Sequence, residues 1–110
     1  MSNDLNIKIY EKISYNDGSI YEGQTKDGKK HGEGRINYKD GSYYYGEWKN
    51  DKREGKGTMK YCKGNKLNID FYYGDWICDS KHGIGTLILL DGRVFRGCWK
   101  HNKLLGLPFN

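Results

Sequence analysis

The side chains of this 110-residue chain that could do chemistry include three histidines and three cysteines (His31, His82 and His101; Cys62, Cys78 and Cys98). A catalytic nucleophile needs a neighbouring base and a third group that orients the base. His31 and His82 stand at the same place in a repeating pattern, immediately before a glycine, and Glu54 and Leu105 take that place in the other copies. A position that accepts Glu and Leu is typical of a turn flank. We therefore expect neither histidine to be catalytic or to bind a metal.

The cysteines and acidic residues also fit structural roles. The cysteines are odd in number and form no CxxC pair, and the start MSNDLNIKIY carries no secretory signal, so reduced thiols in a cytoplasmic protein are expected. His101 and most acidic residues fall in predicted turns or beside strand glycines. No Ser-His-Asp or Cys-His arrangement remains once the repeat is accounted for. The prediction is a protein that is not an enzyme and holds no cofactor or metal ion.

An aromatic-x-glycine motif occurs four times. Its leading aromatics are Tyr21, Tyr44, Tyr72 and Phe95, so successive copies lie 23, 28 and 23 residues apart. Eleven residues after each leading aromatic comes another glycine (Gly32, Gly55, Gly83 and Gly106). The longer interval is explained by five extra residues, 65–69, in a single turn. This period indicates a structural repeat, and the insertion lies where function is often attached.

Each copy reads as a β-hairpin. In the second copy Tyr44, Gly46 and Trp48 alternate onto one face, a turn follows at 49–52, and a return strand covers 55–61. The residue types in the middle of the four turns tolerate a left-handed backbone (Gly28, Asp51, Asp79 and Asn102). The pattern therefore predicts an all-β stack of hairpins in which aromatic rings sit over glycines of neighbouring strands.

The consensus Y-x-G-x-W-x(6)-G-x-G resembles the MORN repeat. Copies starting at Tyr44 and Tyr72 match closely, the copy at Tyr21 has Thr25 in place of tryptophan, and the copy at Phe95 is truncated. A half-repeat at 13–20 precedes them, so we expect a lead-in at 1–12 and an array at 13–110. The resemblance implies a single elongated antiparallel sheet curled into a trough. It also implies roles in scaffolding, membrane-proximal and cytoskeletal assemblies, and phospholipid binding.

Composition limits the cellular setting. The net charge is +5, and the longest apolar run, 87–90, is far too short to span a membrane. The modest charge and the lack of a recognition motif argue against nucleic acid as a partner. The expected location is the cytoplasm, with association to the cytoskeleton or a membrane as a further expectation.

One column of aromatic residues leaves two interpretations open: core packing between hairpins, or an exposed trough that binds a helix or peptide of a larger assembly. The column contains Tyr21, Tyr44, Trp48, Tyr72, Trp76, Phe95 and Trp99. The opposite face is also less polar than a solvated face should be, since it carries Tyr43, Tyr45, Phe71, Tyr73, Ile88 and Leu90. The first functional hypothesis is therefore a protein-interaction scaffold.

Two further surfaces give alternative hypotheses. Basic residues in successive hairpin turns would form a rim facing acidic phospholipid (Lys29, Lys30, Lys52 and Arg53), although acidic neighbours weaken its field. The apolar C-terminal segment 104–109 adjoins a strand edge, which predicts either a self-cap or a homodimer through this end.

Overall fold

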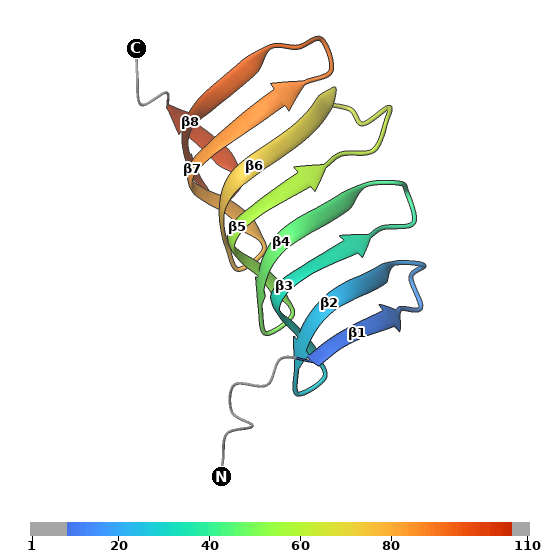
Figure 1. Cartoon of the computed structure of the whole chain (residues 1–110). Helices are drawn as coiled ribbons and strands as arrows, with labels where there is room; N and C mark the ends of the chain where they lie inside the picture. Colours follow the sequence, from blue (N-terminus) through green and yellow to red (C-terminus); the bar gives the residue numbers. More distant parts are fainter. Residues whose placement is uncertain (1–8, 107–110) are drawn as a thin grey trace.

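The computed structural model describes residues 9–106, and it consists of one antiparallel sheet in which the strands follow one another in sequence order (Figure 1). The nine strands are β1 (Ile9–Ser14), β2 (Ile20–Lys26), β3 (Lys29–Asn37), β4 (Tyr43–Lys49), β5 (Lys52–Lys60), β6 (Ile69–Ile77), β7 (Ser80–Leu89), β8 (Val94–Lys100) and β9 (Lys103–Gly106). The molecule measures 53 × 30 × 19 Å. The predicted elongated sheet of hairpins is confirmed. The prediction that the sheet curls into a trough is wrong, because the sheet is not strongly curled.

The hairpins are closed by two-residue turns in which both residues have a positive φ. The pairs are Asp27–Gly28, Asn50–Asp51, Cys78–Asp79 and His101–Asn102, with φ between 46° and 77°. Positive φ at both positions is the mark of the type I′ turn, whose twist matches that of the flanking strands. The left-handed backbone predicted for the second residue of each turn is confirmed.

Each of the first three hairpins contains a β-bulge on the turn side of its central glycine pair. In β4–β5 the register shifts between Gly46 and Trp48, and β2–β3 and β6–β7 shift at the equivalent place. A side chain on the outgoing strand accepts the backbone N–H that the bulge frees: Gln24 from Glu33, Glu47 from Lys56, and Asp75 from Ile84. The residue before the repeat tryptophan, or before Thr25 in the first hairpin, therefore stabilises the bulge.

The core is a ladder of aromatic rings on one face of the sheet. Tyr21, Tyr44 and Tyr72 have no exposed surface. Tyr21 packs edge-to-face against one tryptophan and the other two tyrosines against two each, with ring centroids 5.0–5.6 Å apart. The tryptophan indoles donate to glycine carbonyls of the preceding hairpin: Trp48 to Gly34, Trp76 to Gly57 and Trp99 to Gly85. Each repeat therefore completes the core of the one before it.

Successive hairpins are also joined at their turns. Asp79 accepts the backbone N–H of Arg53 at 2.9 Å, and its own N–H donates to the Arg53 carbonyl at 3.1 Å. Asp51 with Lys30, and Asn102 with Lys81, repeat this reciprocal pair. The Asp51 and Asp79 carboxylates also form ion pairs with Lys30 and Arg53.

We predict that Asp79→Ala lowers the free energy of unfolding by about 1–3 kcal/mol, because it removes the carboxylate that accepts from the Arg53 backbone N–H and from its Nε. Asp79→Asn should cost less, since Asn102 fills the equivalent place with an amide oxygen. Urea unfolding followed by circular dichroism measures both. Equal losses for the two variants would show that charge, and not the backbone hydrogen bond, carries the contribution.

Candidate functional site

The structure places the predicted partner-binding column almost entirely inside the core. The rings of Tyr21, Tyr44, Trp48, Tyr72, Trp76 and Trp99 are at most 5% exposed, and Phe95 is half-buried. Long cationic side chains cover the same face: Lys30 Nζ lies 4.7 Å from the Tyr15 ring centre, and Arg53 Cζ lies 4.7 Å from that of Trp76. The proposed trough is thus filled by the chain itself. Of the two interpretations of this column, core packing and an exposed trough, the structure supports core packing.

The four basic residues considered for lipid binding do not form one surface. Lys29 and Lys52 are exposed. Lys30 is buried and its Nζ lies 3.4 Å from the Asp51 carboxylate, while the Arg53 guanidinium lies 3.0 Å from that of Asp79. Two of the four cations are therefore committed to ion pairs that join hairpins.

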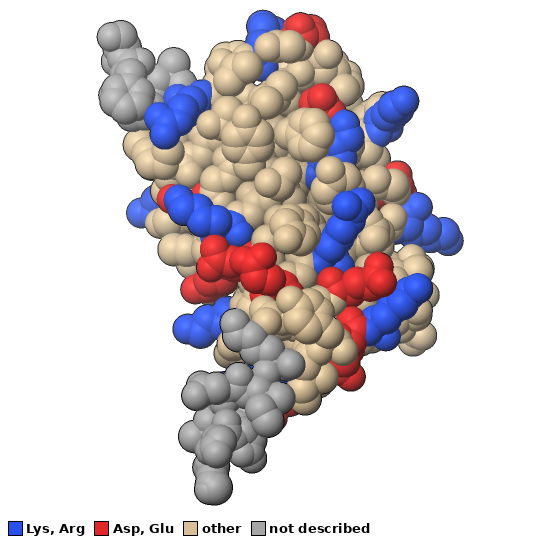
Figure 2. Space-filling view, in the orientation of Figure 1, with Lys and Arg blue, Asp and Glu red and all other residues tan. Residues whose placement is uncertain are grey.

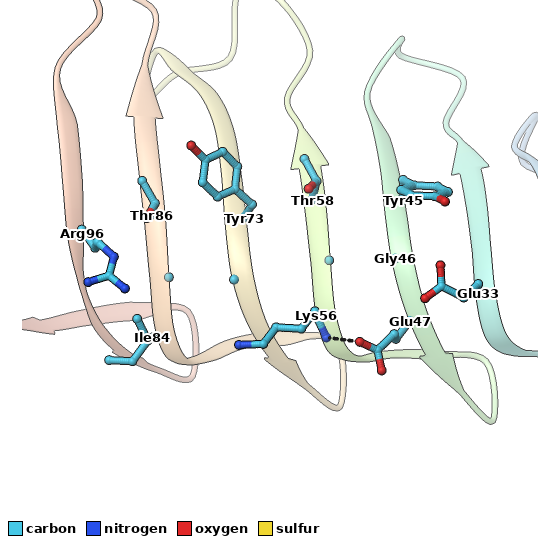
Figure 3. Close-up of a pocket in the computed structure, with 13 residues that line it drawn as sticks. Glu33, Tyr45, Gly46, Glu47, Lys56, Thr58, Tyr73, Ile84, Thr86 and Arg96 are labelled. Carbon is cyan, nitrogen blue, oxygen red and sulfur yellow. Dashed lines mark hydrogen bonds between the residues drawn. The ribbon is translucent and has the colours of Figure 1, made fainter.

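The opposite face holds an open groove of about 530 Å³ that crosses the strands from β3 to β8 (Figure 3). Its floor is the backbone at four glycines (Gly46, Gly57, Gly74 and Gly85). Strand register sets one flank as an alternation of tyrosine and threonine, because Tyr45 pairs with Thr58, Thr58 with Tyr73, and Tyr73 with Thr86. The other flank carries Glu33, Glu47, Lys56 and Ile84.

The groove combines exposed aromatic surface with charge. Tyr45 and Tyr73 are 52% and 44% exposed, and Figure 3 shows both projecting from the sheet on the same side of the glycine floor. Lys56 forms an ion pair with Asp75, which leaves Glu33 and Glu47 as acidic groups at the β3–β4 end. Figure 2 views the same face and shows broad uncharged surface in its upper half, with acidic side chains gathered below. This surface therefore presents apolar and polar groups side by side.

The electrostatics of the described residues reflect packing more than chemistry. Burial raises the pKa of the Tyr21, Tyr44 and Tyr72 hydroxyls well above the ordinary value of 10.0. Hydrogen bonds from turn residues lower the pKa of three aspartates (Asp17 through Ser19, Asp40 through Ser42, Asp91 through Arg93). Between residues 9 and 106 no three His, Cys, Asp or Glu side chains gather in a way that could hold a metal ion.

The sequence itself identifies the family. The pattern of the MORN repeat matches residues 21–43, 44–66 and 72–92, more than half of the chain. This chain belongs to the MORN repeat family. A comparison with curated proteins finds no match. MORN repeats are typically non-catalytic and are often associated with membranes.

The structure extends the MORN array beyond the three matched segments. The strands β8 and β9 form a fourth, shortened hairpin that includes Phe95, and β1 adds a single strand ahead of the first repeat. β1 begins at Ile9, within the predicted lead-in. Among the described residues no helix is long and apolar enough to cross a membrane.

Proposed function

We propose that this MORN array is a non-catalytic interaction scaffold that holds a helix or peptide of a larger assembly in the groove from β3 to β8. The observation that carries the proposal is the pair of half-exposed tyrosines on a rigid sheet, above a floor that has no side chains. Tyrosine is enriched at binding hot spots because it presents a large amphipathic surface at a low cost in side-chain entropy. The buried aromatic column supports this role indirectly, because it joins the hairpins into one continuous sheet.

The dimensions of the groove limit what it can hold. Six strands from β3 to β8 are separated by five steps of about 4.8 Å, so the groove runs for about 24 Å across the sheet. A helix of about 16 residues has this length. Glu33 and Glu47 favour a partner with basic residues toward the β3–β4 end, whereas Ile84 and Tyr73 favour apolar residues further along.

The test is a capture experiment from the source cell, followed by affinity measurement with the purified partner. Tyr45→Ala combined with Tyr73→Ala should weaken binding at least tenfold, since both rings are exposed and central to the groove. The matched control is Tyr10→Ala, which removes a tyrosine that is 71% exposed on β1 and does not line the groove.

The control should bind as the unaltered protein does, and all variants should give the same circular dichroism spectrum. If the double variant at Tyr45 and Tyr73 retains the partners in full, as the Tyr10→Ala control does, the groove is not the binding site. A loss that Tyr10→Ala shares equally would also contradict the proposal, because it would not be specific to the groove.

A further inference from the structure

The tyrosines along one flank of the groove have a defined spacing. Tyr45 and Tyr73 both pair with Thr58, which lies on the strand between theirs, so the two tyrosines stand on alternate strands at the same register. Two strand steps of about 4.8 Å place them about 9.6 Å apart across the sheet. Both rings project on the same side of the glycine floor (Figure 3). The groove therefore offers two aromatic platforms at this spacing.

The spacing of the platforms discriminates between peptide conformations. A polyproline II helix has three residues per turn and rises about 3.1 Å per residue, so every third residue faces the same side about 9.3 Å further on. Residues three apart in a β-strand point to opposite faces, so a strand cannot place both on the tyrosines. In an α-helix the nearest match is seven residues apart, at about 10.5 Å. Polyproline II fits the spacing best, and an α-helix comes second.

The hydroxyls beside the rings separate these two conformations. Thr58 and Thr86 are half-buried, and their hydroxyls form no hydrogen bond with any group in residues 9–106. A polyproline II segment has no internal hydrogen bonds, so its carbonyls can accept from such hydroxyls. The carbonyls of an α-helix are used within the helix. Thr58 lies midway between the two tyrosines, where the carbonyls between two stacked residues would come.

One end of the groove carries negative charge that no cation neutralises within the described part of the chain. Glu33 and Glu47 pair across β3 and β4, and neither forms an ion pair with a residue in 9–106. Glu33 is exposed, while Glu47 accepts the Lys56 N–H at 3.0 Å. Both carboxylates lie at the end of the groove where Tyr45 stands, on the other side of the glycine floor (Figure 3). A basic residue of a bound segment is favoured at this end.

We infer that the groove binds a proline-rich segment in the polyproline II conformation, with prolines three residues apart stacked on Tyr45 and Tyr73 and a basic residue beside Glu33 and Glu47. The inference rests on the proposed function, because it names the class of peptide that the same groove holds. Such a segment already has its bound conformation when free, so it loses little entropy on binding. At about 3.1 Å per residue, a groove about 24 Å long holds about eight residues.

Fluorescence anisotropy with labelled synthetic peptides tests the inference. The main probe is one arginine followed by about eight prolines, and the comparison probe is an alanine-rich α-helical peptide of about 16 residues with an arginine at its start. The proline probe should bind at least tenfold more tightly than the helical one. Tyr45→Ala and Tyr73→Ala should each weaken its binding at least fivefold. Thr58→Val keeps the shape of the side chain, removes the hydroxyl and should cost about fivefold.

The control for the tyrosine variants is Tyr10→Ala, which should bind the proline probe as the unaltered protein does. Tyr10 is 71% exposed on β1 and does not line the groove. Thermal unfolding establishes that all variants are folded. Equal binding by the control and by the two groove variants would place the proline site elsewhere and overturn the inference.

The charged end is tested by exchanging the arginine of the probe for glutamine. The unaltered protein should prefer the arginine probe about threefold, and Glu33→Gln with Glu47→Gln should abolish this preference. The bulge stays intact in this variant, because Gln24 accepts the equivalent backbone N–H in the first hairpin. A preference that persists in the variant would contradict the placement of the basic residue.

Failure of the inference and failure of the proposed function give different results. If the proline probe does not bind, or binds no better than the helical probe, the inference is overturned. The proposed function still stands in that case, provided that partners captured from the cell are lost from the double variant at Tyr45 and Tyr73. If the captured partners do not need these tyrosines, the proposed function itself fails.

Discussion

Gly57→Ala should lower the free energy of unfolding by about 3–5 kcal/mol, the cost of displacing a large buried aromatic side chain. A Cβ at residue 57 would lie within 3.0 Å of the Tyr44 hydroxyl and ring, closer than real Cβ atoms come to any neighbour. Tyr44 cannot give way, because Trp48 and Trp76 pack against both sides of its ring, and its hydroxyl donates to the Glu47 carbonyl at 2.8 Å. The added methyl group therefore disrupts two repeats at once.

The control for this variant is Gly41→Ala. Gly41 has a φ of 93° and nothing within 4 Å of its would-be Cβ, so the substitution brings backbone strain alone, at about 1 kcal/mol. Urea unfolding of the two variants, followed by circular dichroism, separates the effects. Similar losses for both would mean that the Tyr44 ring yields to a methyl group at residue 57, and the ring-over-glycine account of the core would be wrong.

The sequence predicted the arrangement of strands because the arrangement is local. A hairpin needs only alternation and two turn residues that accept a positive φ, and both are visible within about 20 residues. Alternation also placed Tyr44 and Tyr45 on opposite faces correctly. It could not tell which of these two faces the chain closes for itself, since both carry aromatic residues.

What decides between the two faces is a set of contacts between repeats. Trp76 reaches back 19 residues to the Gly57 carbonyl, and Arg53 reaches forward 26 residues to Asp79. As turn residues, Lys30 and Arg53 were expected at an exposed rim, but their ion pairs and aromatic neighbours turn them onto the core face. The partner-binding hypothesis therefore assigned the binding site to the face that forms the core. The open face was visible in the sequence only as aromatic and aliphatic residues at positions where polar residues were expected.

Because the core face buries three tyrosines, the stability of the array should depend strongly on pH in the alkaline range. Unfolded tyrosine ionises near its ordinary pKa of 10.0, whereas burial raises the pKa of Tyr21, Tyr44 and Tyr72 in the folded protein. Above pH 10 the unfolded chain therefore binds fewer protons than the folded one, and stability must fall as the pH rises. Each tyrosine contributes a loss of about 1.4 kcal/mol per pH unit, so the three together should remove about 4 kcal/mol by pH 11.

Urea unfolding between pH 7 and pH 11 measures this loss, and the tyrosinate absorbance reports how many of the ten tyrosines ionise. In the folded protein the three core hydroxyls should stay protonated, and their ionisation should coincide with loss of the circular dichroism signal. Tyr72→Phe should reduce the alkaline loss by about a third, although it removes the hydrogen bond from the Tyr72 hydroxyl to the Asp75 carbonyl and costs about 1 kcal/mol at pH 7. Ionisation of all ten tyrosines near pH 10 in a protein that remains folded would show that the core rings are accessible to water, and would return the aromatic column to the list of candidate binding surfaces.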